Sequence, residues 1–143
     1  MILIDTNLLL YAHVRSMAEH ERANRWLTGE LNSGSRIGLP WHSLLGFVRL
    51  ASNRAAFSNA MSVAEAWQQV MNWLRVDTVW VPLPTDRHVT VLNDLFTTSG
   101  VTTRAVMDIH LAALAIEHGL TLCSADTGFV RYKQLRWMNP LTE

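Results

Sequence analysis

Short apolar runs recur along the chain, and between them apolar residues are spaced three or four positions apart. A short apolar run bounded by polar residues predicts a strand, whereas the longer spacing predicts a helix that buries one face. Strands that alternate with helices are typical of an α/β fold with a parallel sheet covered on both faces. The predicted strands are residues 2–4, 36–39, 79–81, 120–123 and 135–137.

The expected helix boundaries follow from capping residues, prolines and glycines. The longest predicted helix runs from about Thr103 to His118 and is apolar on nearly every side, so we expect it to be buried. Ser62 and Glu65 have the spacing of a capping box, in which each side chain binds the other residue's backbone N–H. The other predicted starts are Asp5 or Thr6, Pro40 and Thr85, and the predicted ends include Gly34, Gly100 and Gly119.

Composition narrows the class of protein. The chain has 143 residues, of which 49% are apolar and 17% charged, so we expect one globular domain over residues 1–143. No apolar run approaches the roughly 18 residues of a membrane span, and no signal peptide is evident at the N-terminus. With its single cysteine, Cys123, the chain is expected to be cytoplasmic. The net charge of zero neither predicts nor excludes a nucleic-acid partner.

Three aspartates are the candidate functional residues. Asp5 and Asp126 each follow a predicted strand, and Asp108 lies near the start of the long helix. Because parallel strands end at the same edge of a sheet, we expect these carboxylates to come together there. Each also has a purely structural explanation, as a helix cap, a first-turn acid or a turn residue. A cluster of carboxylates would favour a hard divalent cation such as Mg²⁺.

Three segments of the chain resemble one protein family. They are the opening Ile2-Leu3-Ile4-Asp5-Thr6-Asn7, the helix segment from Asp108 to Gly119, and Ser124-Ala125-Asp126 followed by Phe129. With these segments in this order, the chain resembles the PIN-domain nucleases, and most closely the VapC-type toxins of bacterial toxin–antitoxin pairs.

The resemblance implies a three-layer α/β/α sandwich and a ribonuclease that depends on Mg²⁺ or Mn²⁺. It also implies an RNA substrate, a cognate antitoxin that silences the enzyme, and a homodimer. By the family's motif, Asp5, Asp108 and Asp126 form the acidic cluster, with Asp5 and Asp108 as the direct metal ligands. Asp126 is implied to hold a water of the ion or a second ion. The side chains expected to support the site by hydrogen bonds are those of Thr6, Asn7 and Ser124.

One position departs from the family pattern. The family usually has a fourth acid, a glutamate, on the helix after the second strand, and here Gly46 falls at the expected position. We consider two explanations for Gly46: loss of the acid, or space for substrate or for close helix packing. His42 lies one turn before Gly46 on the same face, and we interpret it as a partly buried structural residue that could also approach the metal.

Two other functions are considered. A phosphotransfer enzyme also has an aspartate after a strand, but it needs a second acid beside Asp5 and a lysine, and Lys133 is the sole lysine of the sequence. A catalytically weak or inactive PIN-fold module that binds RNA or an antitoxin is the stronger alternative. The stripe of Trp67, Val70, Met71 and Leu74 on a predicted amphipathic helix could bind another subunit or an antitoxin helix, or complete the core.

Overall fold

A five-stranded parallel sheet lies at the centre of the computed structural model, which describes residues 1–98 and 100–142. Its strand order is β3-β2-β1-β4-β5, so the first strand of the chain is the middle strand of the sheet. The predicted α/β class is therefore confirmed, and each strand lies within or one residue beyond its predicted run. The strands are β1 (Ile2–Ile4), β2 (Ile37–Gly38), β3 (Val79–Trp80), β4 (Thr121–Cys123) and β5 (Trp137–Met138).

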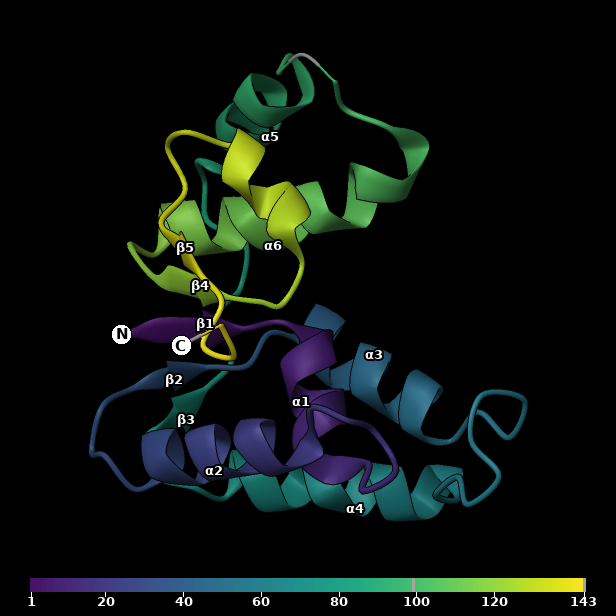
Figure 1. Ribbon diagram of the computed structural model, residues 1–143. Coiled ribbons are helices and arrows are strands. Elements are labelled where there is room, and N and C mark those ends of the chain that lie inside the picture. Colours follow the sequence, from purple (N-terminus) through teal and green to yellow (C-terminus); the bar gives the residue numbers. More distant parts are fainter. Residues whose placement is uncertain (99, 143) are drawn as a thin grey trace.

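Helices cover both faces of the sheet, as the three-layer sandwich requires. Figure 1 shows α5 and α6 in the upper half of the molecule with β4 and β5, and α1 to α4 in the lower half with β2 and β3. All strands run in the same direction, so their carboxyl ends meet at one edge. The helices are α1 (Thr6–His13), α2 (His20–Leu31), α3 (Trp41–Ala51), α4 (Val63–Leu74), α5 (His88–Phe96) and α6 (Val106–Glu117), with 3₁₀ helices η1 (Thr103–Ala105) and η2 (Thr127–Arg131).

The alternation of side chains along β1 divides the core into two clusters. Leu3 packs into the cluster under α5 and α6, whereas its neighbour Ile4 packs into the cluster with α1 to α4. Both residues are fully buried, as expected for a strand covered on both faces. Within the described residues, no helix has the length and apolar character that crossing a membrane requires.

The observed helix ends match the predicted ones where a capping residue or a glycine sets the end. The capping box of Ser62 and Glu65 is present, and Gly119 ends α6 with a φ of 66° that favours glycine. The expectation that Thr85 caps the next helix is wrong, because α5 begins only at His88. Thr85 instead donates its backbone N–H and its hydroxyl to the carboxylate of Glu117 on α6.

Gly46 allows α3 to pack closely against the start of α1. A Cβ atom at position 46 would lie 2.5 Å from Oγ1 of Thr6 and 3.1 Å from its Cγ2. Thr6 has little freedom to move away, since its hydroxyl donates a hydrogen bond of 3.1 Å to the carbonyl of Ser43. Of the explanations considered for the glycine, the structure therefore supports close helix packing.

Candidate active site

Asp5 is held at the carboxyl end of β1 by bonds on both sides. Its backbone N–H donates to the carbonyl of Cys123 on β4, at 3.0 Å, and its Oδ1 accepts the N–H of Thr6, at 2.7 Å. The second of these bonds makes Asp5 the N-cap of α1, which was one of its predicted structural explanations. The side chain is 8% exposed, so the carboxylate lies at the rim of the core.

The hydroxyl of Ser124 forms hydrogen bonds with three residues at the carboxyl ends of β1 and β4. It donates to Oδ2 of Asp5 at 2.7 Å, and it accepts the side-chain amide of Asn7 at 3.1 Å and the N–H of Asp126 at 3.0 Å. Asn7 in turn accepts the N–H of Ala125 at 3.2 Å. Of the predicted supporting side chains, those of Asn7 and Ser124 thus join the ends of β1 and β4, whereas the hydroxyl of Thr6 donates to Ser43 on α3.

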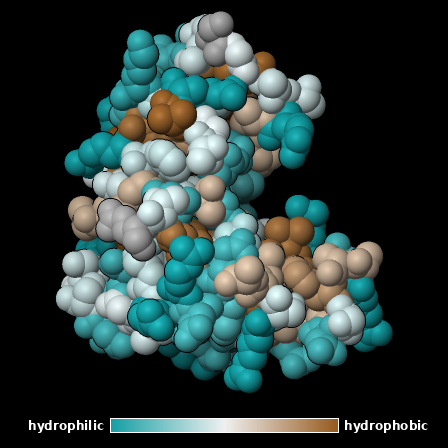
Figure 2. Space-filling view, in the orientation of Figure 1, coloured by the Kyte–Doolittle hydropathy of each residue, from teal (hydrophilic) through white to brown (hydrophobic). Residues whose placement is uncertain are grey.

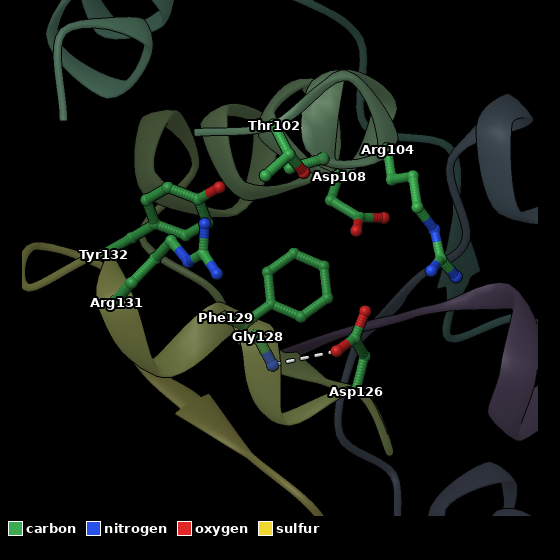
Figure 3. A pocket seen from close by; sticks show the side chains of 9 residues that line it. Thr102, Arg104, Asp108, Asp126, Gly128, Phe129, Arg131 and Tyr132 are labelled. Carbon is green, nitrogen blue, oxygen red and sulfur yellow. Dashed lines mark hydrogen bonds between the residues drawn. The ribbon is translucent and has the colours of Figure 1, made fainter. Parts of the chain in front are cut away.

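Asp108 and Asp126 line a pocket of about 330 Å³ beside Asp5 (Figure 3). Asp108 lies in the first turn of α6, whereas Asp126 caps η2 by accepting the N–H of Gly128 at 2.8 Å. The buried ring of Phe129 also lines the pocket and lies between the two carboxylates in Figure 3. The two carboxylates come from different elements and both point into the pocket.

Burial and neighbouring negative charges raise the pKa values of Asp108 and Asp5. Burial raises the pKa of Asp108 to about 6, and the negative charges of Asp5 and Asp126 add to the rise. Burial also raises the pKa of Asp5, while hydrogen bonds from Ser124 and Thr6 oppose the rise. These shifts have the sign expected for like charges brought together at a partly dry edge. A cation placed among the carboxylates would relieve that repulsion.

The donor set fits a hydrated Mg²⁺ ion better than a fully protein-ligated one. Among residues 1–98 and 100–142, no three His, Cys, Asp or Glu side chains are arranged to hold an ion together. Mg²⁺ retains several waters and needs only one or two carboxylates. The partly exposed carboxylate of Asp108 and the carboxylate of Asp5 at the rim of the core are oxygen ligands of that kind.

Several residues near the acids were not found by sequence reasoning. Arg104, Arg131, Thr102 and Tyr132 also line the pocket. The position of Arg104, four residues before Asp108 on one continuous helical segment, was a signal that the two share a face. No local pattern connects Arg131 to the acids, because the fold of η2 against α6 brings it there.

Histidines from α3, α5 and α6 form a second group of titratable side chains. Nε2 of His88 lies 3.2 Å from Nδ1 of His110, and the ring of His42 meets that of His110 edge-on, with centroids 6.0 Å apart. His88 also contacts the buried carboxylate of Glu117 through Nδ1. His42 is partly buried, as predicted, and its charge lowers the pKa of Asp5.

Large apolar side chains are exposed on the surface of α3 and α4. Trp41 and Trp67 are 40% and 41% exposed, and their rings stack with centroids 6.4 Å apart. The predicted stripe on α4 is thus divided, because Val70 is buried in the core while Trp67 faces outward. Figure 2 shows hydrophobic side chains over α3, beside a hollow between the two halves of the molecule. We call Trp41, Leu45, Val63 and Trp67 the aromatic patch.

Comparisons with known proteins agree with this architecture. The family model described as PIN domain matches residues 2–135. Ribonuclease VapC37 of Mycobacterium tuberculosis (strain ATCC 25618 / H37Rv) is 38% identical over 98% of this chain and 97% of its own length. Ribonuclease VapC33 of the same strain is 34% identical over the full length of both proteins.

Solved structures share the fold at lower sequence identity. FitAcB from Neisseria gonorrhoeae matches with a TM-score of 0.68 and 19% identity over all of both chains. VapBC2 from Rickettsia felis, solved with a promoter DNA fragment, has a TM-score of 0.66 and 18% identity over 97% of this chain and 98% of that one. The match to the family model and the full-length relatives place this chain in the PIN domain family, in the group that includes the VapC ribonucleases.

Proposed function

We propose that the chain is a metal-dependent endoribonuclease that hydrolyses RNA phosphodiester bonds as the toxin of a toxin–antitoxin pair. The observation that carries the proposal is the convergence of Asp5, Asp108 and Asp126 at one edge of the sheet, where their charges act on one another. The relatives named as VapC ribonucleases, similar along their whole length, support the same activity.

Asp5 and Asp108 are the proposed ligands of Mg²⁺, with Mn²⁺ as a possible substitute. Asp126 would hold a water of the hydrated ion or a second ion. A divalent cation bound here supplies positive charge that offsets the charge developing on the phosphodiester, and it lowers the pKa of a water molecule. The raised pKa of Asp108, about 6, leaves its carboxylate ionised at neutral pH and able to bind a cation.

The remaining residues of the site hold these carboxylates in place. Ser124 and Thr6 fix the two oxygens of Asp5, so its orientation is set before any ligand binds. Asn7 joins β1 to the segment that carries Asp126. A site organised in this way spends little energy on reorganisation when the substrate arrives.

Cleavage of labelled RNA by the purified protein tests the proposal. With Mg²⁺ or Mn²⁺ the parent should cut RNA, and a chelator should stop it. Asp5→Asn, which keeps size and polarity, should abolish cleavage while circular dichroism shows a retained fold. Asp94→Asn, which neutralises an exposed acid on α5, is the matched control and should cut at the parental rate. Equal rates for Asp5→Asn and the parent would reduce Asp5 to a helix cap.

The proposed partner is a small antitoxin whose apolar helix binds the aromatic patch. Two stacked, partly exposed tryptophans are the kind of surface on which a partner helix gains most of its binding energy. FitAB and VapBC2 were both solved with a DNA fragment. A basic side chain of the antitoxin would suit the acidic pocket. We also propose a cytoplasmic homodimer, which light scattering of the purified protein can measure.

A catalytically weak or inactive module that binds RNA or an antitoxin is the alternative. Gly46 favours it, because no carboxylate can replace the family's glutamate without displacing Thr6. RNA that is bound but left intact by the parent, with either metal present, would support this alternative.

A further inference from the structure

Two arginines lie on opposite sides of the acidic pocket. Figure 3 shows Arg104 on one side of Asp108 and Asp126, and Arg131 on the other side, next to Tyr132. The residues that line the pocket thus include two negative and two positive side chains. The positive charges are separated across the pocket, and the carboxylates lie between them.

Arg104 is exposed and extends beside Asp108 without forming an ion pair with it. It lies in η1, which continues directly into α6, four residues before Asp108. None of the acidic groups that the structure describes lies within 4.0 Å of its guanidinium nitrogens. The five N–H donors of the guanidinium are therefore available to a ligand.

Arg131 is anchored at one nitrogen and open at the others. Its Nη1 donates a hydrogen bond of 2.6 Å to the carbonyl of Gly100, which fixes the guanidinium at the pocket wall. No described acid neutralises its charge within 4.0 Å. An anchored guanidinium loses less freedom on binding than a free side chain, so it is suited to hold a phosphate.

We propose that Arg104 and Arg131 bind the two phosphates that flank the scissile phosphate of a single-stranded RNA. This inference rests on the proposed ribonuclease function. The acids alone would repel a polyanion, whereas guanidinium groups on both sides attract the neighbouring phosphates and centre the chain over the carboxylates. Contacts to the sugar–phosphate chain position the RNA without reading its sequence.

Binding of RNA that cannot be cut tests the proposal without relying on cleavage. The probe is a fluorescent single-stranded 2′-O-methyl oligoribonucleotide, and anisotropy gives Kd over a range of salt concentrations with Mg²⁺ constant. Arg104→Gln and Arg131→Gln should each raise Kd about tenfold. Each should also reduce the slope of log Kd against log salt by about 0.7, the value for one lost phosphate contact on a single strand.

Control variants separate phosphate binding from loss of charge or of structure. Arg25→Gln removes a charge from α2, where Arg25 is 76% exposed and pairs with Glu21, and should change neither Kd nor slope. Arg131→Lys keeps the charge, so it should keep the parental slope even if loss of the bond to Gly100 weakens binding. Thermal melts of all variants confirm that each is folded.

The outcomes distinguish this proposal from the proposed function. Unchanged Kd and slope in both glutamine variants, or equal losses in Arg25→Gln, would overturn the phosphate contacts even if the parent cuts RNA. Failure of the parent to bind the probe would also overturn them. Arginine-dependent binding by a parent that cuts no RNA would support the contacts and reject the ribonuclease.

Discussion

The hydroxyl of Ser124 donates a 2.7 Å hydrogen bond to Oδ2 of Asp5 across 119 positions of the sequence. Ser124 is fully buried, and the same oxygen accepts two further hydrogen bonds, from Asn7 and Asp126. One hydroxyl group therefore satisfies a buried carboxylate and joins the two strands that carry the candidate site.

Ser124→Ala should lower the free energy of unfolding by about 1–3 kcal/mol, since buried polar groups lose their partner. The hydrogen bond from Ser124 lowers the pKa of Asp5, which burial raises, so its loss should raise that pKa further. A carboxyl whose pKa is higher in the folded state than in the unfolded state destabilises the protein at any pH where the unfolded carboxyl is ionised. The stability lost in Ser124→Ala should therefore be larger at pH 8 than at pH 4. Urea unfolding at both pH values measures it.

Ser52→Ala is the control for this experiment. Ser52 donates to the carbonyl of Val48 at 2.7 Å at the end of α3, away from the acids. Its loss should cost less and show no pH dependence. A pH-independent effect of Ser124→Ala would contradict the predicted coupling to Asp5.

Asp108 should make the metal-free protein less stable as the pH rises from about 4 to 6. The unfolded carboxyl loses its proton near pH 4, whereas the folded one retains it up to about pH 6, so the folded state binds more protons in this window. Asp108→Asn has no carboxyl to ionise at this position. Above pH 6 its free energy of unfolding should therefore be higher than the parent's by about 1 kcal/mol, after allowance for solvent screening. Thermal melts across this pH range measure the difference.

With Mg²⁺ present, the parent should become more stable than Asp108→Asn. Above pH 6 the ion should stabilise the parent more than Asp108→Asn, because it binds the ionised carboxylate. Asp94→Asn should behave as the parent in both conditions. Equal Mg²⁺ shifts for the parent and Asp108→Asn would argue that Asp108 does not bind the ion.

Gly46→Ala should have opposite effects in two backgrounds. In the parent, the new methyl group meets Thr6 and displaces its hydrogen bond to Ser43, so we expect a loss of about 1 kcal/mol. In a Thr6→Ala background the same change should stabilise by about 0.5–1 kcal/mol, the helix propensity of alanine over glycine. Urea unfolding of the parent, the two single variants and the double variant gives the coupling free energy between positions 6 and 46. Identical effects in both backgrounds would mean that Thr6 does not restrict position 46.

Glu117→Ala should be strongly destabilising, by about 3 kcal/mol, because Thr85 and His88 lose a buried acceptor. Burial would raise the pKa of Glu117, but hydrogen bonds from Thr85 and His88 outweigh it and hold the pKa below its ordinary value. The stabilisation is present above the unfolded pKa of 4.5 and is lost as the pH falls through the folded one.

Glu117→Gln tests that pH dependence directly. Its cost relative to the parent should be full at pH 7 and should shrink toward pH 3, as followed by denaturant unfolding. Glu21→Gln, at an exposed pair on α2, should cost under about 0.5 kcal/mol throughout. If the cost of Glu117→Gln stays constant with pH, the charge of the Glu117 carboxylate does not contribute to the interaction between α5 and α6.

Trp67→Ala should weaken binding of the proposed antitoxin at least tenfold, since a half-exposed stacked tryptophan is a typical binding hot spot. RNA cleavage should be unchanged, because Trp67 lies outside the acidic pocket. Calorimetric titration with the product of the adjacent reading frame measures the affinity. Val89→Ala, which truncates an exposed residue of α5, is the control. Equal affinities for Trp67→Ala and the parent would show that the antitoxin does not bind the aromatic patch.

Local patterns in the sequence predicted the features that depend on a few consecutive residues. The strand before Asp5, the capping box at Ser62 and the turn at Gly119 are of this kind. The candidate acids stood out because Asp5 and Asp126 follow predicted strands and Asp108 lies near the start of a predicted helix.

Features that depend on contacts between distant elements were missed. Thr85 has the sequence of a helix cap, but a buried carboxylate on α6 competes for its hydrogen bonds. Gly46 marks a departure from the family's motif, and the contact with Thr6 that explains it joins two helices. Arg131 reaches the pocket through a bond to the carbonyl of Gly100, which no periodicity reveals.

The central place of β1 has a consequence for synthesis on the ribosome. Strand β1 pairs on one side with β4, which the ribosome makes long after β1. A nascent chain that ends before Thr121 lacks the strand beside β1, the hydroxyl that orients Asp5, and Asp126 itself. The acidic pocket is therefore completed only after β4 and η2 have been synthesised. If the proposed ribonuclease acts through this pocket, it gains activity only once that part of the chain has left the ribosome.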